Sequence, residues 1–301
     1  MIKAFIKKTL QLACKLLLNL HSPYYIIMVD GGLGSQIFKY ALGTAIHEKT
    51  NATIYYDLSW FSKNGMDINN KFSRKFEICN VFPSVQMNPP SKLLLTLTYF
   101  SNCYSTKYPH IFDNDIFSKR NIYLDSYFAN INYFYLARNT LIKNLLFSNI
   151  YLKYKLSEHK NSIAVHIRQG DYINSVHDVV TPKYFINAMN YFINAFDNCY
   201  FYIFCTSPDY FTKHLSKSLP KNLKYEIITG SDEDGSIDMY RMSECRHFII
   251  SNSSFSLFPA WLNKHNGTVI MPSKWHSNMD SDMTKDSDKA FLLENAIVME
   301  V

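Results

Sequence analysis

The sequence predicts an α/β protein with two domains, each built on a parallel sheet. Short apolar runs typical of strands alternate with segments of helical spacing in both halves of the chain, which is the pattern of parallel βαβ units. The polar segment at 157–161 separates these halves. With 301 residues, of which 47% are hydrophobic, the chain can bury two cores of ordinary domain size. We therefore expect domains at 23–156 and 157–301, preceded by a helix at 1–22.

The segment at 1–22 predicts an amphipathic helix. Hydrophobic side chains recur at intervals of three and four residues, which places them on one helix face: Ile2, Phe5, Ile6, Leu10, Ala13, Leu16, Leu17 and Leu20. Lysines interrupt this run before it reaches the roughly 20 residues that a bilayer span needs. The pattern favours peripheral membrane contact through residues 1–20. The alternatives are a helix docked on the domain and a short signal-like sequence, although no small-residue cleavage site follows.

The first domain opens with a strand at 24–30, a glycine-rich turn, a helix and a second strand at 52–57. The turn leads into the start of the helix, where backbone N–H groups are unpaired and the helix dipole attracts anions. We therefore predict contacts to a phosphorylated ligand, with a tight turn alone as the alternative. The candidate residues are Gly32, Gly34, Ser35 and Gln36. Residues 60–150 are rich in aromatic side chains, and their topology stays open.

The second domain repeats the alternation of strands and helices. Strands are predicted at 162–167, 200–205, 224–230, 247–250 and 267–272, the last of which ends the sheet. Helices are predicted at 181–196, 206–219, 237–245 and 254–265. Because parallel strands place their carboxyl-terminal loops at one edge of a sheet, we expect the ligand to bind along that edge.

The end of the strand at 162–167 and the loop after it hold three candidate catalytic residues, His166, Arg168 and Asp171. Alternation places His166 and Arg168 on the same side of the strand. A guanidinium offers a fork of N–H donors that matches phosphate oxygens, so Arg168 is predicted to bind a diphosphate. Asp171 is expected to hold Arg168 in one rotamer or to cap the next helix. The alternatives are an ordinary surface ion pair and, for His166, a purely hydrogen-bonding role.

A second polar loop follows the strand at 247–250 and leads into a helix. Its hydroxyls and amide suit phosphate or ribose oxygens, so this loop is also predicted to contact the ligand. The candidate residues are Asn252, Ser253, Ser254 and Phe255. Capping of the helix is the alternative, and capping is compatible with anion binding. Asp238, on the preceding helix, is predicted to accept hydrogen bonds from the edge of a nucleobase.

Composition argues against a metal site and against nucleic-acid binding. The six cysteines lack CxxC spacing and the ten histidines lack an HExxH pair, so no structural metal is expected and the thiols fit a reducing compartment. The acidic run at 232–234 superficially matches a metal-binding DxD motif, but we interpret it as a solvated loop. A net charge of +6 favours anionic ligands or membrane surfaces, without the dense basic stripe of a nucleic-acid binder.

Together these loops resemble the bacterial α-1,2-fucosyltransferases of the galactoside 2-fucosyltransferase type, which use GDP-fucose. GGLGSQIFKYALG is similar to the family's GGLGNQMFQYAFG, and VHIRQGDY is similar to its VHIRRGDY. DMYRMSECRHFIISNSSFSLFPAWL resembles DLYLMSLCKHNIISNSSFSWWAAWL, and YLDSYFANINYF resembles YLDGYFQSEKYF. The similarity runs from about Met28 to Trp275. Among the departures, Ser35 replaces an asparagine, Ser126 a glycine, and Gln169 an arginine that would face the diphosphate.

The resemblance implies a GT-B fold, in which two Rossmann-like domains with parallel sheets face each other across a cleft. The acceptor side would lie in the first domain and the donor side in the second. The implied reaction is an inverting, metal-independent transfer of L-fucose from GDP-β-L-fucose to the 2-hydroxyl of a terminal β-galactoside. It needs no cofactor besides this donor.

The chemistry of the loops agrees with such a reaction. Negative charge grows on the leaving GDP, and Arg168, the amides of the glycine loop and the hydroxyls of Ser253 and Ser254 would neutralise it. The acceptor hydroxyl must also lose a proton. The expected base is Asp171, His166, Asp57 or a phosphate oxygen.

The expected setting is O-antigen or capsule synthesis at the cytoplasmic face of the inner membrane, where the acceptor glycan can be lipid-linked. Nucleic acid is not an expected partner. Two other hypotheses stay open. One is a fucosyltransferase of another linkage, α-1,6 or protein O-fucosyl. The other is a non-catalytic Rossmann protein that binds a nucleotide or NAD, which the glycine turn and Asp57 would suit.

Overall fold

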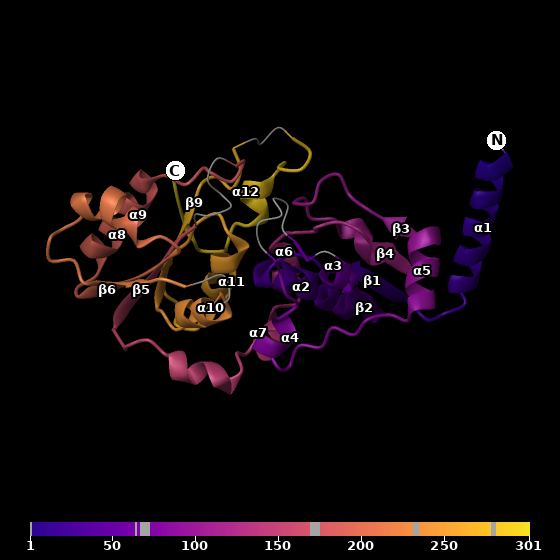
Figure 1. Ribbon diagram of the computed structural model, residues 1–301, viewed down its shortest axis with the longest axis horizontal. Helices are drawn as coiled ribbons and strands as arrows, with labels where there is room; N and C mark the ends of the chain where they lie inside the picture. The colour runs from indigo at the N-terminus through magenta and orange to yellow at the C-terminus, as the bar shows by residue number, and fades with distance from the viewer. Residues whose placement is uncertain (1, 64, 67–72, 169–174, 231–234, 278–280) are drawn as a thin grey trace. The chain divides into compact units, whose positions relative to one another are not determined.

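A computed structural model gives the structure of the chain (Figure 1) and describes residues 2–63, 65–66, 73–168, 175–230, 235–277 and 281–301. The chain forms two compact units. The N-terminal unit comprises Met1–Leu146 and Asp282–Lys285, and the C-terminal unit comprises Phe147–Ser281 and Asp286–Val301. The chain thus passes from one unit to the other after Leu146, upstream of residue 156, where the polar segment suggests the boundary.

The sheet of the N-terminal unit has the strand order β2-β1-β4-β3, and its strand pairs are parallel. The strands are β1 (Tyr24–Met28), β2 (Thr53–Asp57), β3 (Cys103–Tyr104) and β4 (Ile122–Leu124). Helix α2 (Leu33–Thr50) connects β1 to β2, which confirms the predicted βαβ unit. Strand order reverses between β1 and β4, so the loops after these two strands meet at one edge of the sheet.

The aromatic segment whose topology the sequence leaves open supplies β3, β4 and short helices. These helices are α3 (Ser59–Lys63), α4 (Ile78–Val81), α5 (Lys92–Ser101), η1 (Asn114–Ser118), α6 (Asn132–Leu136) and α7 (Arg138–Asn144). The predicted amino-terminal helix forms as α1 (Ile2–Leu18) and packs beside α5 (Figure 1). Among the helices of the described residues, none is both long and apolar enough to cross a bilayer.

The sheet of the C-terminal unit has the strand order β10-β9-β8-β5-β6-β7, and its strand pairs are also parallel. Its strands are β5 (Asn161–Ile167), β6 (Cys199–Cys205), β7 (Tyr225–Ile228), β8 (His247–Ile249), β9 (Val269–Pro272) and β10 (Ile297–Met299). Counted from β5, this is the order 3-2-1-4-5-6 of a Rossmann fold. The prediction that the strand at 267–272 ends the sheet is wrong, because the short strand β10 pairs with β9.

Helices η2 (Asn149–Tyr154), α8 (Pro182–Ala195), α10 (Gly235–Ser243), α11 (Ser254–Leu262) and α12 (Ser287–Ala290) complete this unit. The helix predicted at 206–219 is irregular: α9 (Pro208–Tyr210) continues as the π-helical η4 (Phe211–Leu215) and the 3-10 helix η5 (Ser216–Ser218). The hydroxyls of Thr212 and Ser216 donate back to carbonyls of the preceding turn, a contact that bends helices.

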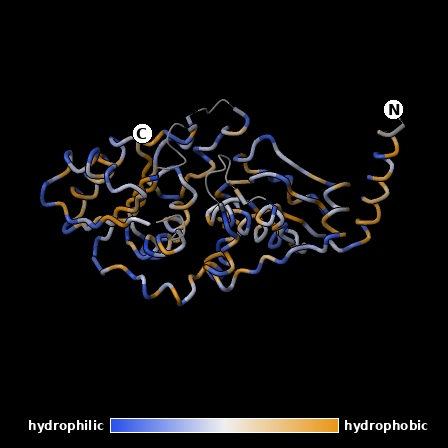
Figure 2. The backbone as a smooth tube through the Cα atoms, viewed as in Figure 1, coloured by the Kyte–Doolittle hydropathy of each residue, from blue (hydrophilic) through white to orange (hydrophobic). Residues whose placement is uncertain are grey.

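The core of the C-terminal unit positions the strand ends. Alternate residues of β5, such as Ile163 and Val165, pack with Phe192 of α8 in a fully buried cluster. From the same helix, the buried Tyr184 hydroxyl donates to Ile250 O (2.7 Å) and to Ile270 O (3.2 Å). One side chain of the core therefore joins the carboxyl end of β8 to the neighbouring strand β9. Figure 2 shows the apolar strands of this sheet beside more polar helices.

Candidate functional site

Strand order in the C-terminal sheet reverses between β5 and β8, which are neighbours in the sheet. Open α/β sheets bind ligands in the crevice outside the carboxyl ends of the strands at such a reversal. Here β5 leads into Arg168 and β8 leads into Ser251. The structure thus brings the first residue of one sequence-predicted loop, Arg168, and the start of another, Ser251, to the edge where this fold favours a ligand.

A hydrogen bond joins the two strand ends. His166 Nδ1 lies 2.9 Å from Ser251 Oγ, and both side chains are buried. Burial and the nearby charge of Arg168 lower the pKa of His166 to about 3. The imidazole is therefore neutral at neutral pH and is a weak base. This arrangement favours a positioning role for His166, and its catalytic role stays a prediction.

Arg168 follows β5 directly and is partly exposed. Arg168 lies two residues beyond His166 in the chain, and its positive charge contributes to the lowered pKa of that ring. A partly exposed arginine at a strand-order reversal is suited to bind a phosphate. Asp171, the third candidate catalytic residue, lies outside the described residues, as do Gln169 and the acidic run at 232–234.

The loop after β8 begins α11 as the sequence predicts. Ser253 caps the helix, since its hydroxyl accepts a hydrogen bond from Phe255 N at 3.3 Å. Ser254, the first helical residue, is partly exposed beside it. The amide nitrogen of buried Asn252 donates to His177 O (2.9 Å) and Trp275 O (2.8 Å). The two N–H donors of Asn252 thus hold loops of the unit. At the start of α11, the partly exposed Ser254 places its hydroxyl near solvent.

Phe255 and Asp238 lie at the same edge of the sheet. The ring of Phe255 lies 5.5 Å from that of His166, centroid to centroid, and a methyl group at Gly235 would be 3.6 Å from it. Phe255 therefore connects the end of β5 to the start of α10. On α10, the Asp238 carboxylate fills the space where a side chain at Gly230 would be, and lies 3.4 Å from Arg241 Nη1.

The glycine loop of the N-terminal unit connects β1 to α2. Gly31 adopts a φ of +73°, and a Cβ there would lie 2.8 Å from Ser35 Oγ, so the turn requires glycine. Gly32 caps α2 in an extended conformation and contributes no side-chain hydrogen bond to the helix start. Ser35 Oγ lies 2.9 Å from Tyr127 OH, and Gly34 is buried in the first turn.

Gln36 fastens this loop to the rest of the unit. Its fully buried amide nitrogen donates to Gly31 O (3.1 Å) and Lys75 O (2.8 Å). Its amide oxygen accepts from Glu77 N (3.0 Å) and Ile78 N (3.1 Å). The side chain therefore stabilises the turn, and the predicted ligand contacts of the loop fall to its backbone amides and to Ser35.

Asp57, a candidate base, is buried at the end of β2. Its two carboxylate oxygens accept hydrogen bonds from Tyr123 OH (2.9 Å) and Ser59 N (3.0 Å). Burial and the Asp57 carboxylate raise the pKa of the Tyr123 hydroxyl well above its ordinary value. These contacts connect β2 to β4 across β1 and fit a structural role.

The fully buried Lys39 of α2 is a charged group that the sequence motifs do not single out. Lys39 Nζ donates to Ser126 O at 2.6 Å, lies 3.8 Å from Asp30 Oδ1, and lies 5.4 Å from the ring centre of Tyr127. Burial lowers the pKa of Lys39, and the carboxylates of Asp30 and Asp125 oppose this shift. The signal in the sequence is a lysine inside the apolar run IFKYALG.

The Lys39 group lies at the strand-order reversal of the N-terminal sheet. Asp30 follows β1, and Asp125 and Ser126 follow β4. The Asp30 side chain is 28% exposed, so a ligand can reach it from solvent. The fully buried ammonium of Lys39, 3.8 Å away, compensates the negative charge of Asp30. A carboxylate in this position can accept a hydrogen bond from a sugar hydroxyl.

The chain is similar to known proteins over most of its length. A family model described as Glycosyl transferase family 11 matches residues 76–296. Escherichia coli alpha-1,2-colitosyltransferase is 30% identical over 273 residues, covering 83% of this chain and 91% of that protein. The O-antigen biosynthesis glycosyltransferase WbnK of Escherichia coli is 25% identical over 302 residues, covering 86% of this chain and 97% of that protein.

The fold also resembles a solved structure. A mutant of Arabidopsis thaliana FUT1 in complex with GDP superposes with a TM-score of 0.50 at 14% identity, covering 89% of this chain and 78% of that chain. At this identity the likeness concerns the fold alone. Together with the two Rossmann-like units, it confirms the predicted GT-B class.

The buried state of His166 predicts a pH dependence of stability. Its folded pKa of about 3 lies below its unfolded value of 6.5, so the unfolded chain binds the proton first and stability falls as pH drops below about 6.5. One such proton contributes a slope of up to about 1.4 kcal/mol per pH unit. We expect the free energy of unfolding, measured with urea at several pH values between about 3 and 6.5, to depend less steeply on pH in His166→Asn than in wild type. An equal dependence on pH in both proteins would contradict the burial of a neutral ring.

The Lys39 group predicts an asymmetric pair of substitutions. Asp30→Asn leaves a buried ammonium with less compensation, and we expect it to lower the free energy of unfolding by about 2 kcal/mol, allowing for the partial exposure of Asp30. The double variant Asp30→Asn/Lys39→Met also removes the buried charge, so its free energy of unfolding should return most of the way to the wild-type value. Urea denaturation measures both. If Asp30→Asn alone leaves stability unchanged, the ion pair does not support the loop.

Proposed function

This chain belongs to glycosyl transferase family 11, and we propose that it transfers L-fucose from GDP-β-L-fucose to the 2-hydroxyl of a terminal β-galactoside. The observation that carries the proposal is that β5, which leads into Arg168, and β8, which leads into α11, are neighbours at the strand-order reversal. The family membership also agrees with the resemblance of the three loops to bacterial α-1,2-fucosyltransferases.

In this proposal the C-terminal unit binds the donor. The diphosphate of GDP gains charge as the bond to fucose breaks, and donors that are already in place stabilise it without reorganisation. Arg168 supplies a positive charge, and the backbone amide and hydroxyl of Ser254 at the start of α11 supply N–H and O–H donors. These groups provide the neutralisation that a divalent ion provides in other transferases. The proposed reaction is therefore metal-independent.

The guanine base is assigned to the neighbouring helix. The N1–H and amino groups of guanine are donors, and the carboxylate of Asp238 is an acceptor at the same sheet edge. Phe255 offers an aromatic face between His166 and the start of α10. A Rossmann-like sheet with its reversal at β5 and β8 binds nucleotides along this edge.

The N-terminal unit would bind the acceptor. Inversion by direct displacement requires a base for the acceptor hydroxyl. The low pKa of His166 and the two hydrogen bonds on Asp57 make these residues weaker candidates than Asp171. Asp30, partly exposed and paired with Lys39, joins Asp171 as a candidate.

A second donor is favoured by one finding. The relative with 30% identity is named alpha-1,2-colitosyltransferase, and colitose is L-fucose without its 3-hydroxyl. The second candidate function is therefore transfer of colitose from GDP-colitose. In both cases the relative WbnK supports a place in O-antigen synthesis, where a lipid-linked glycan at the cytoplasmic face of the inner membrane would be the acceptor.

A donor competition tests the proposal. The purified protein is incubated with lactose as the galactoside, EDTA, and either GDP-fucose or GDP-colitose, and the product linkage is determined. We expect a 2'-linked fucoside and a preference for GDP-fucose of roughly 10⁴-fold in kcat/KM. The reason is that a site whose polar groups bind the 3-hydroxyl of fucose would leave those groups unpaired when colitose, which lacks that hydroxyl, is bound.

Four other results would each change one part of the proposal: the donor, the linkage, the independence from metal or the catalysis itself. Preference for GDP-colitose would assign the second donor. A 6-linked product would replace the proposed linkage. Loss of transfer in EDTA, with recovery on adding a divalent ion, would refute the metal-independent mechanism. GDP bound without transfer to any galactoside would favour a non-catalytic nucleotide-binding protein.

A further inference from the structure

Helix α1 leaves most of its hydrophobic side chains in solvent. The face that the sequence predicts to be apolar is exposed, and Phe5 (73%), Leu16 (62%) and Leu17 (64%) are well exposed on it. A different line of residues covers the domain: Leu18 is buried, and Gln11 Nε2 donates to Phe100 O of the neighbouring α5 at 2.9 Å. The helix is thus docked on the unit through one face while its apolar face stays open.

Helix α5 extends this apolar surface. It packs beside α1 and exposes Leu93 (69%) and Tyr99 (53%). Figure 2 shows that hydrophobic and hydrophilic residues alternate along α1 at the N-terminus. Exposed hydrophobic side chains concentrated on two neighbouring helices are unusual for a surface that meets only water.

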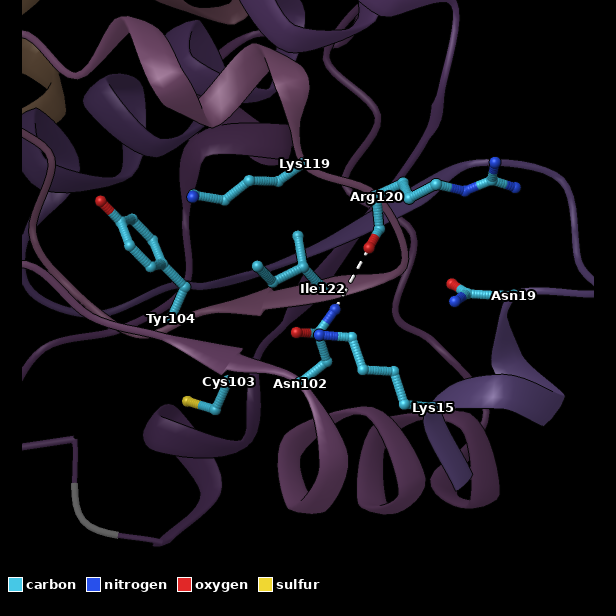
Figure 3. A pocket seen from close by; sticks show the side chains of 8 residues that line it. All are labelled: Lys15, Asn19, Asn102, Cys103, Tyr104, Lys119, Arg120 and Ile122. Atoms are coloured by element: carbon cyan, nitrogen blue, oxygen red, sulfur yellow. Dashed lines mark hydrogen bonds between the residues drawn. The ribbon is translucent and has the colours of Figure 1, made fainter. Parts of the chain in front are cut away.

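A basic pocket lies at the base of these helices (Figure 3). Its volume is about 310 Å³, and its lining includes Lys15 and Lys119 with the amides of Asn19 and Asn102. Arg120 also lines the pocket, but its guanidinium extends away from Lys119 and Tyr104 (Figure 3). None of the eight described residues that line it is acidic. The pocket therefore presents cations and amide donors, a combination that suits a phosphate group.

The pocket wall includes contacts of Lys119, Asn102 and Arg120. Lys119 Nζ lies 4.4 Å from the ring centre of Tyr104, and the Tyr104 hydroxyl donates to Asp113 at 2.5 Å. Asn102 Nδ2 donates to Arg120 O at 3.2 Å, the bond drawn in Figure 3. Arg120 donates in turn to His21 O at 3.4 Å, just beyond α1. The pocket is thus built from both the sheet edge and the end of α1.

Lys15, in the pocket wall, is followed along α1 by the exposed Leu16 and Leu17. Apolar side chains at the acyl boundary combined with cations at the phosphate level are the features of a helix that lies on an anionic membrane. We propose that α1 and α5 dock on an anionic bilayer, and that the basic pocket binds the phosphate headgroup of an anionic phospholipid. The proposal goes beyond the transfer reaction and does not depend on it.

Co-sedimentation of the full chain with vesicles tests the proposal. Wild type should bind vesicles of phosphatidylglycerol and phosphatidylcholine, and should bind phosphatidylcholine alone much more weakly. The pocket variant Lys15→Gln/Lys119→Gln/Arg120→Gln should bind the anionic vesicles on the order of 100-fold more weakly, at roughly 5-fold for each basic side chain. Leu16→Asp/Leu17→Asp, at exposed positions, should also abolish binding.

A matched control removes the same charge elsewhere. Lys217, Lys221 and Lys224 are exposed in the C-terminal unit, and their replacement by glutamine should leave vesicle binding within a few-fold of wild type. Circular dichroism confirms that each variant is folded. An equal loss in the control and pocket variants would overturn the pocket as a specific site, and equal binding to neutral vesicles would overturn the choice of an anionic lipid.

Calorimetry with inorganic phosphate separates the two sources of the same chemistry. Binding of free phosphate to the pocket, without binding to anionic vesicles, would assign the pocket to a soluble anion and refute the membrane proposal. Vesicle binding uses no sugar nucleotide, so its failure leaves the proposed transfer reaction untouched, and a failure of the transfer reaction leaves the membrane proposal untouched.

Discussion

The reversal of strand order between β5 and β8 is the constraint on which the rest of the site depends. The two strands are parallel neighbours, but the chain continues from β5 toward β6 on one side of the sheet and from β8 toward β9 on the other. Their carboxyl ends therefore leave an uncovered edge. The His166–Ser251 hydrogen bond and the Tyr184 hydroxyl hold that edge in register. A rigid backbone there lets Arg168 and the start of α11 present charge and donors without reorganisation.

The N-terminal unit meets the same constraint with a different solution. Its reversal lies between β1 and β4, and the loops after those strands are joined through the buried ammonium of Lys39. A buried charge is costly unless it is paired, and here Asp30 and the Ser126 carbonyl supply the pairing. Both units therefore place polar groups where strand order reverses, one around a guanidinium and one around a partly exposed carboxylate.

Periodicity and loop motifs predict the α/β class, the parallel βαβ unit and the strands β5 to β9, because each is encoded by local patterns. Local patterns do not reveal residues whose roles are defined by distant partners. Lys39 is explained only by Asp30 and Ser126, and Gln36 by the carbonyl of Lys75 and the amide of Ile78. The three-residue β10 is too short to carry a period, and it forms because β9 offers an edge.

We propose that the carboxyl edge of the C-terminal sheet binds the donor's diphosphate through Arg168. Calorimetric titration with GDP tests it most directly, using Arg168→Ala and, as a matched control, Arg246→Ala, which removes an exposed arginine just before β8 at the opposite end of that strand. The loss of a charge-assisted contact should weaken GDP binding by about 100-fold in Arg168→Ala, while Arg246→Ala binds like wild type. Equal GDP affinity in wild type and Arg168→Ala would contradict the account.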